Sequence, residues 1–378
     1  MAEHLFTSES VSSGHPDKLC DQISDAILDA CIQADPFARV AVETLVKGMK
    51  EKSLIVLGGE VTVNGEIPDY EKIARDTCAK VGYTSHDIGM DATSEELCEV
   101  RVAITTQSPD ISDGVNVGGA GDQGMMFGYA CNETEDLMPS PIHYSHKITK
   151  ALSHARHSGE DWLGPDGKSQ ITFLYSDINK PVGISNIVCS AQHDANIAIE
   201  EVRKKVEEII KPTVEDYDTS ETEFLINPTG RFVIGGPAGD TGLTGRKIIV
   251  DTYGGYAPHG GGAFSGKDCV KVDRSGAYIA RYLAKNIVAS NVAKNATVQL
   301  SYAIGIPEPT SLYVYADGKV RTDIADWFIN NIDLTPLGII NKFDLFNIKL
   351  TDTTNYGHFG DSNLPWEVID LKDEIKSL

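Results

Sequence analysis

The sequence predicts an α+β protein, with mixed α/β character, built from three similar modules. With 378 residues, the chain is long enough for two or three domains that each have their own core. The order helix, strand, strand, helix, strand recurs with a period of roughly 125–135 residues, which is typical of repeated modules. Short turns between adjacent strands favour antiparallel pairs, so we expect mixed sheets rather than a doubly wound parallel sheet.

The first module is predicted to contain five elements: a helix at 18–33, strands at 39–46 and 54–63, a helix at 70–81 and a strand at 97–105. In the first helix, apolar residues recur at three- and four-residue spacing. Pro16 suits its first turn, where a backbone N–H has no helical partner.

The second and third modules repeat this order. The second is predicted from a helix at 142–156, strands at 169–176 and 184–191, a helix at 194–210 and a strand at 224–234. The third is predicted from a strand at 248–251, a helix at 275–289, strands at 297–303 and 311–315 and a helix at 323–332. We therefore place domains at 1–106, 125–233 and 234–378.

Residues 107–124 separate the first two domains and show no hydrophobic periodicity. Loops of this length inside compact domains are usually functional or disordered. We favour a mobile active-site lid.

Composition disfavours several classes of function. The net charge is −22, from 33 basic and 55 acidic residues, which argues against nucleic acid or an anionic membrane as partner. No apolar run is long enough to span a bilayer, and the N-terminus does not resemble a secretory signal. The seven cysteines include no CxxC pair, which predicts reduced thiols, no zinc site and a cytoplasmic location. The histidine pairs 143/146 and 154/157 are expected to be solvated.

Residues 228–281 concentrate glycine and positive charge. This stretch holds 13 of the 35 glycines, and seven Arg or Lys against four Asp. Glycine lets backbone N–H groups approach a ligand, and the cations form charge-assisted bonds to anionic oxygens. The pattern indicates a polyphosphate site, while composition alone leaves open a turn-rich region with scattered surface charge.

Three further motifs could carry chemistry. In Gly14-His15-Pro16-Asp17-Lys18, a helix start would favour an anion, with His15 donating, Asp17 binding Mg²⁺ and Lys18 holding a phosphate. The alternative is a helix simply capped by Ser13. The Gly-Asp-x-Gly turns at 121–124 and 239–242 could present a carboxylate to a substrate, although each alone is more typical of an Asx turn.

The segment 261–268, GGAFSGKD, nearly matches a phosphate-binding P-loop. Asp268 stands where that motif needs a Ser or Thr hydroxyl for Mg²⁺, and the predicted strand at 248–251 is too far upstream. It is therefore not a Walker A motif, but Lys267 and its neighbouring amides can still bind phosphate.

Together these motifs resemble the S-adenosylmethionine synthetase (methionine adenosyltransferase) family over nearly the whole chain. The long matching segments are GHPDK (14–18), GAGDQG (119–124), GRFVIGGPAGD (230–240), GRKIIVDTYGG (245–255) and GGGAFSGKD (260–268). The resemblance implies three similar domains about a pseudo-threefold axis, and synthesis of S-adenosylmethionine from ATP and L-methionine. In that reaction the sulfur attacks C5′ of ATP, and tripolyphosphate leaves and is hydrolysed to phosphate and diphosphate.

The resemblance also implies the site residues. The ATP contacts are His15, Asp166, Lys168, Arg231, Phe232, Asp240, Arg246, Lys247, Ala263, Lys267 and Lys271. The catalytic ones among them are His15, Lys168, Arg246 and Lys267. Methionine would contact Glu60, Gln107, Asp122, Asp240, Lys271 and Ile304.

By the same resemblance, two Mg²⁺ ions per site would be held by Glu9, Asp17 and Asp273, and an activating K⁺ by Glu43. A homodimer is expected as the smallest active unit, with a homotetramer as the common assembly, because the family's sites lie between subunits.

The chain departs from the family pattern at two places. Ser13 replaces the usual Glu before GHPDK, and the segment 107–121 is several residues shorter than usual. The alternatives to an active synthetase are a silent nucleotide-binding paralogue, which would lack a metal or phosphate residue, and an unrelated phosphotransferase, which would need an acceptor-activating base.

Overall fold

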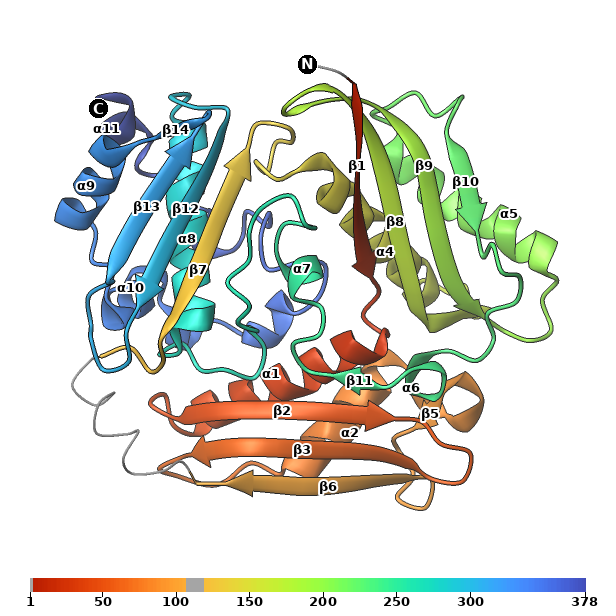
Figure 1. The fold of residues 1–378 in the computed structure, drawn as a ribbon. Coiled ribbons are helices and arrows are strands. Elements are labelled where there is room, and N and C mark those ends of the chain that lie inside the picture. The colour runs from red at the N-terminus through yellow and green to blue at the C-terminus, as the bar shows by residue number, and fades with distance from the viewer. Residues whose placement is uncertain (1–2, 107–118) are drawn as a thin grey trace.

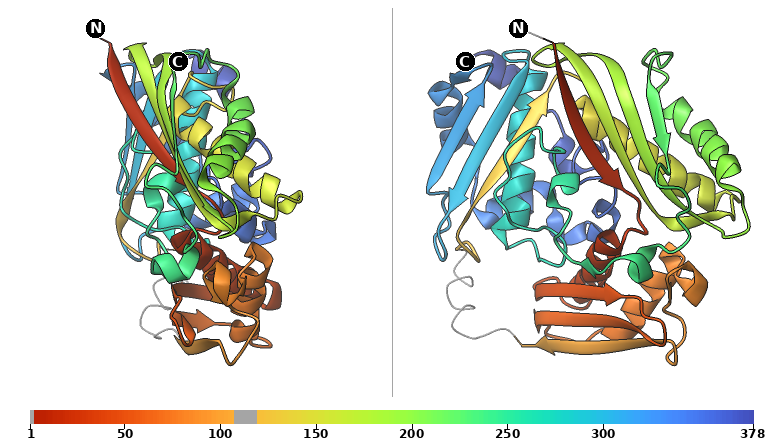
Figure 2. Two further views of the ribbon diagram at one scale, coloured as in Figure 1. Left: turned by 90° about the vertical axis from the view of Figure 1, so that its right-hand side faces the viewer. Right: turned by 45° about the vertical axis from the view of Figure 1, so that its right-hand side comes forward.

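Three four-stranded sheets, each backed by helices, surround the middle of the molecule (Figure 1). The computed structural model describes residues 3–106 and 119–378. In Figure 1 the long helices lie behind the sheets, and the side view in Figure 2 places helices on one side of the second sheet. The α+β class and the three-module layout predicted from the sequence are confirmed.

The first sheet follows its prediction closely, with strand order β11-β2-β3-β6. Its elements are α1 (Pro16–Ala34), β2 (Arg39–Lys47), β3 (Ser53–Thr62), α2 (Tyr70–Val81) and β6 (Cys98–Thr105). Strands β2 and β3 pair antiparallel, whereas β6 runs parallel to β3. The parallel pair is possible because α2 carries the chain back across the sheet between the two strands.

The second sheet has the order β1-β8-β9-β10 and repeats the same plan. Its elements are β1 (His4–Val11), α4 (Ser140–His157), β8 (Leu163–Asp177), β9 (Lys180–His193), α5 (Ile199–Ile210) and β10 (Glu223–Ile226). Helix α5 connects the parallel strands β9 and β10 as α2 connects β3 and β6.

Two predicted boundaries in this module were wrong. The strand predicted to reach residue 234 ends at Ile226, because Asn227 adopts a positive φ of 41° and turns the chain out of the sheet. The helix predicted from residue 194 begins at Ile199. The Asp194 carboxylate accepts the Asn196 N–H at 2.6 Å and forms a turn there instead.

The third sheet is antiparallel throughout, with the order β14-β13-β12-β7. Its elements are β7 (Gly124–Cys131), α8 (Val272–Ala289), β12 (Asn295–Tyr302), β13 (Ser311–Ala316), β14 (Lys319–Val320), α9 (Thr322–Asn331) and α10 (Pro336–Phe343). The strand predicted at 248–251 is instead the short helix α7 (Ile248–Asp251), in which the Asp251 N–H donates to the Lys247 carbonyl at 2.9 Å.

The remaining short elements connect or flank these layers. They are β4 (Thr84–Ser85), β5 (Met90–Asp91), α6 (Gly236–Gly239), β11 (Gly242–Leu243), α11 (Lys372–Lys376) and the 3-10 turns at His86–Ile88, Lys211–Val214, Leu345–Asn347, Leu350–Thr353 and Pro365–Glu367.

The sheets exchange strands in a cycle. Strand β1 precedes α1 of the first module but pairs with β8 of the second sheet. Strand β7 precedes α4 of the second module but pairs with β12 of the third, and β11 precedes α8 of the third module but pairs with β2 of the first. This cyclic pairing gives the pseudo-threefold arrangement, and it crosses the predicted domain boundaries, which stay a prediction.

Helices α1 and α8 are buried along almost their whole length, including most of their charged residues. Arg281 on α8 is fully buried and pairs with Glu367 at 2.8 Å, and Lys285 pairs with the same carboxylate at 2.7 Å. Burial alone would raise the pKa of Glu367, but the two cations outweigh it and the pKa is lowered. In the described part of the chain, no helix is long and apolar enough to cross a membrane.

We predict that Glu367→Ala destabilises the protein by about 3–5 kcal/mol, because it leaves Arg281 and Lys285 without their buried carboxylate. The midpoint of urea unfolding measures this loss. The matched control is Asp352→Ala, which removes an exposed pair with Lys349 and should cost about 0–1 kcal/mol. Equal midpoints for the two variants would contradict the structural role of Glu367.

Candidate active site

The N-terminal end of α1 lies between the first and second sheets, directly below the end of β1 (Figure 1). Gly14 allows a close approach here, since a Cβ on it would lie 2.2 Å from the Pro165 carbonyl oxygen. The Ser12 N–H also donates to the Gly167 carbonyl at 2.9 Å. These contacts place Asp166 and Lys168 of β8 beside the start of α1.

His15 is the N-cap of α1, a position that the sequence assigned to Ser13 in its alternative interpretation. Its Nδ1 accepts the Asp17 N–H at 3.1 Å, so the neutral ring carries its proton on Nε2. Burial, together with the charges of Lys247 and Lys168, lowers the pKa of His15 to about 3. His15 is therefore a neutral hydrogen-bond donor at physiological pH.

Asp17, in the first turn of α1, brings the loop 242–247 to this helix. Its Oδ1 accepts the Leu243 N–H at 3.0 Å, and its Oδ2 pairs with Lys247 at 2.6 Å. Arg246 Nε lies 3.8 Å from the same carboxylate, with about half of its side chain exposed. The buried Asp17 carboxylate thus holds Arg246 and Lys247 beside the start of α1, where they can bind an anionic ligand.

Asp166 links the segment 235–240 to the same cluster. Its Oδ2 accepts the Gly236 N–H at 2.8 Å, while its Oδ1 is buried without a hydrogen-bond partner in the described residues. Burial raises the pKa of Asp166 to about 6. Asp240 is exposed and close enough that its charge acts on both Asp166 and His15.

A second group forms around Lys267, whose ammonium pairs with Asp273 at 2.6 Å. Gly262 packs directly against this carboxylate, since a Cβ on it would lie 2.3 Å from Asp273 Cγ. Ala263 connects this group to the first one, because a Cβ on Gly245 would lie 2.6 Å from the Ala263 Cβ. Lys271 pairs with the buried Asp268 at 2.6 Å.

Other expected site residues lie at exposed positions of strands and turns. They are Glu9 on β1, Glu43 on β2, Glu60 on β3, Asp122 and Ile304. None of them forms an ion pair with a described residue. Arg231 donates to the Ala195 carbonyl at 2.6 Å. The Phe232 N–H donates to His193 Nε2 at 3.0 Å, and the Phe232 carbonyl accepts the His193 N–H at 3.0 Å. Gln107 and residues 107–118 of the expected lid lie outside the described residues.

The oxygen donors present fit Mg²⁺, even though the described residues contain no group of three or more His, Cys, Asp and Glu arranged around a metal. Mg²⁺ is usually bound through one or two carboxylates plus substrate phosphates and water. Asp17 and Asp273 each provide one carboxylate beside a lysine, which matches that mode of binding.

Two sequence interpretations were wrong. Lys18 does not reach a phosphate, because its ammonium is buried and pairs with Asp21 at 2.9 Å and with Asp251. His146 is not solvated: its Nδ1 lies 2.8 Å from Ser10 Oγ, and burial lowers its pKa to about 3. All seven cysteines are buried and free.

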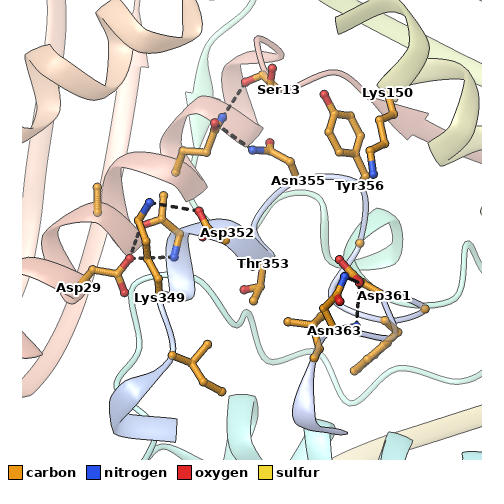
Figure 3. Close-up of a pocket in the computed structure, with 18 of the residues that line it drawn as sticks. Ser13, Asp29, Lys150, Lys349, Asp352, Thr353, Asn355, Tyr356, Asp361 and Asn363 are labelled. Atoms are coloured by element: carbon orange, nitrogen blue, oxygen red, sulfur yellow. Dashed lines mark hydrogen bonds and ion pairs between the residues drawn. The ribbon is translucent and has the colours of Figure 1, made fainter. Parts of the chain in front are cut away.

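A cavity of about 1450 Å³ lies away from these groups (Figure 3). It is lined by the other face of α1, by α4 and by the segment 346–364, and by none of the expected site residues. Several charged residues that line the cavity already have partners there. Lys349 pairs with Asp352, and Asp29 accepts the backbone N–H groups of Leu350 and Thr351. It is therefore not the candidate active site.

Sequence reasoning missed the buried carboxylates that hold the site loops, Asp21 and Asp25. Asp21 accepts the Gly245 N–H at 2.9 Å, and Asp25 accepts the Gly266 N–H at 2.8 Å and pairs with Arg274. The available signal was the repeat of Asp at every fourth residue of α1, from Asp17 to Asp29.

Comparison with known proteins gives one family along the whole chain. The N-terminal, central and C-terminal domains of S-adenosylmethionine synthetase match residues 3–109, 117–232 and 234–368. A solved structure of an unusual S-adenosylmethionine synthetase from Campylobacter jejuni is 38% identical, with a TM-score of 0.92 and 99% of each chain covered. The chain therefore belongs to the S-adenosylmethionine synthetase family.

Proposed function

We propose that the chain makes S-adenosylmethionine from ATP and L-methionine by direct attack of the methionine sulfur on C5′ of ATP. The observation that carries this proposal is the cluster of His15, Asp17, Lys168, Arg246 and Lys247 at the start of α1. A thioether needs no base to make it nucleophilic. Catalysis must then come from positioning and from stabilising the charge that develops on the leaving tripolyphosphate.

Each cluster residue has a role in this proposal. Neutral His15 donates from Nε2 to the oxygen that bridges ribose and triphosphate, and Lys168, Arg246, Lys247 and Lys267 bind the phosphate oxygens. Cations fixed by buried carboxylates suit this task because they need little reorganisation when the leaving group gains charge. The same residues would hold the tripolyphosphate while it is hydrolysed to phosphate and diphosphate.

The remaining nucleotide and methionine contacts are proposed from the family motifs. Asp166, Arg231, Phe232 and Ala263 would contact ATP, and Asp240 and Lys271 would serve both substrates. Glu60, Gln107, Asp122 and Ile304 would surround methionine. Asp240 is already near His15 and Asp166, which supports its place between the two substrates.

Mg²⁺ would be held by Asp17 and Asp273, with Glu9 close by and two ions per site, and K⁺ by Glu43. When bound, Mg²⁺ would supply positive charge against the triphosphate oxygens. Asp17 and Asp273 also keep Lys247 and Lys267 in place, so each carboxylate would serve a metal and orient a cation.

A homodimer is proposed as the smallest active unit, with a homotetramer as the expected assembly. Exposed apolar side chains lie on two of the sheets, including Val102 on β6, Met125 on β7 and Tyr313 on β13. A second copy would cover such surfaces and would bring Glu43, Glu60 and Asp122, which form no ion pair with the described residues, to the site of a neighbouring chain. A cytoplasmic location, without nucleic acid or membrane partners, stays part of this proposal.

The direct test is to incubate the purified protein with ATP, methionine, Mg²⁺ and K⁺. We expect S-adenosylmethionine, phosphate and diphosphate, and Lys267→Ala should lower turnover by at least about 10²-fold, or roughly 2.7 kcal/mol of barrier. Bound nucleotide without product would identify a silent paralogue, and transfer of the γ-phosphoryl group would identify a phosphotransferase. Lys319→Ala, on the exposed strand β14, is the control and should keep wild-type turnover.

Potassium dependence tests Glu43 separately. K⁺ should stimulate the wild-type enzyme, and Glu43→Val should abolish the stimulation, because it removes the carboxylate proposed to bind the cation. The assay is turnover as a function of KCl concentration at constant ionic strength. A Glu43→Val enzyme with wild-type stimulation would remove Glu43 from the monovalent site.

The low pKa of His15 predicts a pH dependence of stability. The unfolded chain binds a proton at this residue below about pH 6.5, whereas the folded chain does not until about pH 3. Its contribution to stability is therefore constant above pH 6.5 and falls as the pH drops toward 3. Between about pH 6 and about pH 5, the free energy of unfolding measured in urea should fall by about 1 kcal/mol less for His15→Asn than for the wild type. Parallel losses would show that His15 titrates alike in both states.

A further inference from the structure

Four carboxylates lie along one side of α1, at Asp17, Asp21, Asp25 and Asp29. Residues four apart share one face of a helix. Each of the four accepts a backbone N–H from a different residue of the segment 243–350, namely Leu243, Gly245, Gly266 and Leu350. The helix therefore fixes, residue by residue, where four distant points of the chain lie.

Asp21 holds the centre of the loop that carries Arg246 and Lys247. Its Oδ1 accepts the Gly245 N–H at 2.9 Å, and its Oδ2 lies 2.9 Å from the Lys18 ammonium. Lys18 also pairs with Asp251 of α7, the short helix that follows this loop directly. The carboxylate thus fixes the loop both directly and through Lys18 and α7.

The loop has other anchors at Thr244, whose N–H donates to the Thr44 carbonyl at 3.0 Å and whose hydroxyl lies 2.9 Å from Ser24 Oγ. At Gly245, the backbone N–H is held by Asp21. Gly245 has a φ of +78°. Glycine adopts positive and negative φ about equally, so the residue type alone does not select this conformation. Gly245 also packs tightly against Ala263. Asp17 fixes Leu243, two residues earlier, and shares its carboxylate with Lys247. Without Asp21, Asp17 would still hold Leu243 and Lys247, but the Gly245 N–H between them would lose its acceptor.

We propose that Asp21 is a positioning residue for ATP, acting through the Gly245 peptide to place the Arg246 and Lys247 cations against the triphosphate. The inference rests on the proposed function, because it assumes that these two cations bind phosphate. Asp21 itself is buried and touches no substrate. Its effect on catalysis is therefore exerted entirely through the loop.

The test compares Asp21→Ala with Asp29→Ala. Both variants remove a carboxylate of α1 that accepts backbone N–H bonds, but Asp29 holds Leu350 and Thr351, which belong to neither site group. Asp21→Ala should lower kcat/KM for ATP at least about tenfold, with KM for methionine within about twofold of wild type. Asp29→Ala should keep kcat/KM for ATP within about twofold, whatever stability it loses.

A second, more conservative variant covers the case in which Asp21→Ala does not fold. Asp21→Asn keeps the volume and should fold, since Lys18 retains Asp251 as its partner. One terminal atom of the amide is a donor, so the side chain cannot accept from Gly245 and face the Lys18 ammonium equally well. We expect a loss of kcat/KM for ATP in the same direction as for Asp21→Ala, but smaller. If both folded Asp21 variants match Asp29→Ala in kcat/KM, the positioning role is overturned.

Hydrogen–deuterium exchange separates this inference from the proposed function. In Asp21→Ala, exchange should rise in residues 242–247, and in Asp29→Ala it should rise in residues 350–353 instead, whether or not the wild type makes S-adenosylmethionine. A wild type without product would reject the proposed function. Unchanged exchange at 242–247 in Asp21→Ala would reject the positioning role.

Discussion

The arrangement of the three modules depends on helix α1 and the carboxylates that it buries. A buried carboxylate without a partner is costly, so each of Asp17, Asp21 and Asp25 requires a donor from elsewhere in the chain. The donors come from residues more than 200 positions away, in the loops that carry the site cations. The contacts that pack the interior around α1 are therefore the same contacts that bring the site loops together.

Local patterns predicted the helices and hairpins well, because the spacing of apolar residues reflects the face that each element buries. Helix α2 was predicted at its observed bounds, and β2 and β3 within one residue. The exchanged strands β1, β7 and β11 were missed. Their partners lie in other modules, and β11 has only two residues, so no local pattern distinguishes them from loops.

The sequence indicated which residue types gather at the candidate site, but not how those side chains are paired or protonated. The concentration of glycine and positive charge within 228–281 indicated a polyphosphate site, and the structure shows Lys247 and Lys267 each fixed by a carboxylate. The sequence could not show that the Lys18 ammonium pairs with Asp251, which lies 233 residues away. Nor could it show that His15 is neutral, since that state depends on burial and on Lys168 and Lys247.

The positive cluster also explains how an acidic chain would receive an anionic substrate. With a net charge of −22, the protein surface repels ATP in general, so attraction must be local and short-ranged. Arg246 remains half exposed, and Lys168 is exposed on its strand. The proposed attack of a sulfur nucleophile would have to exclude competing water, so such cations would need to be covered during turnover. The described residues of one chain leave these cations exposed, which is a physical reason to expect that a second copy completes the site.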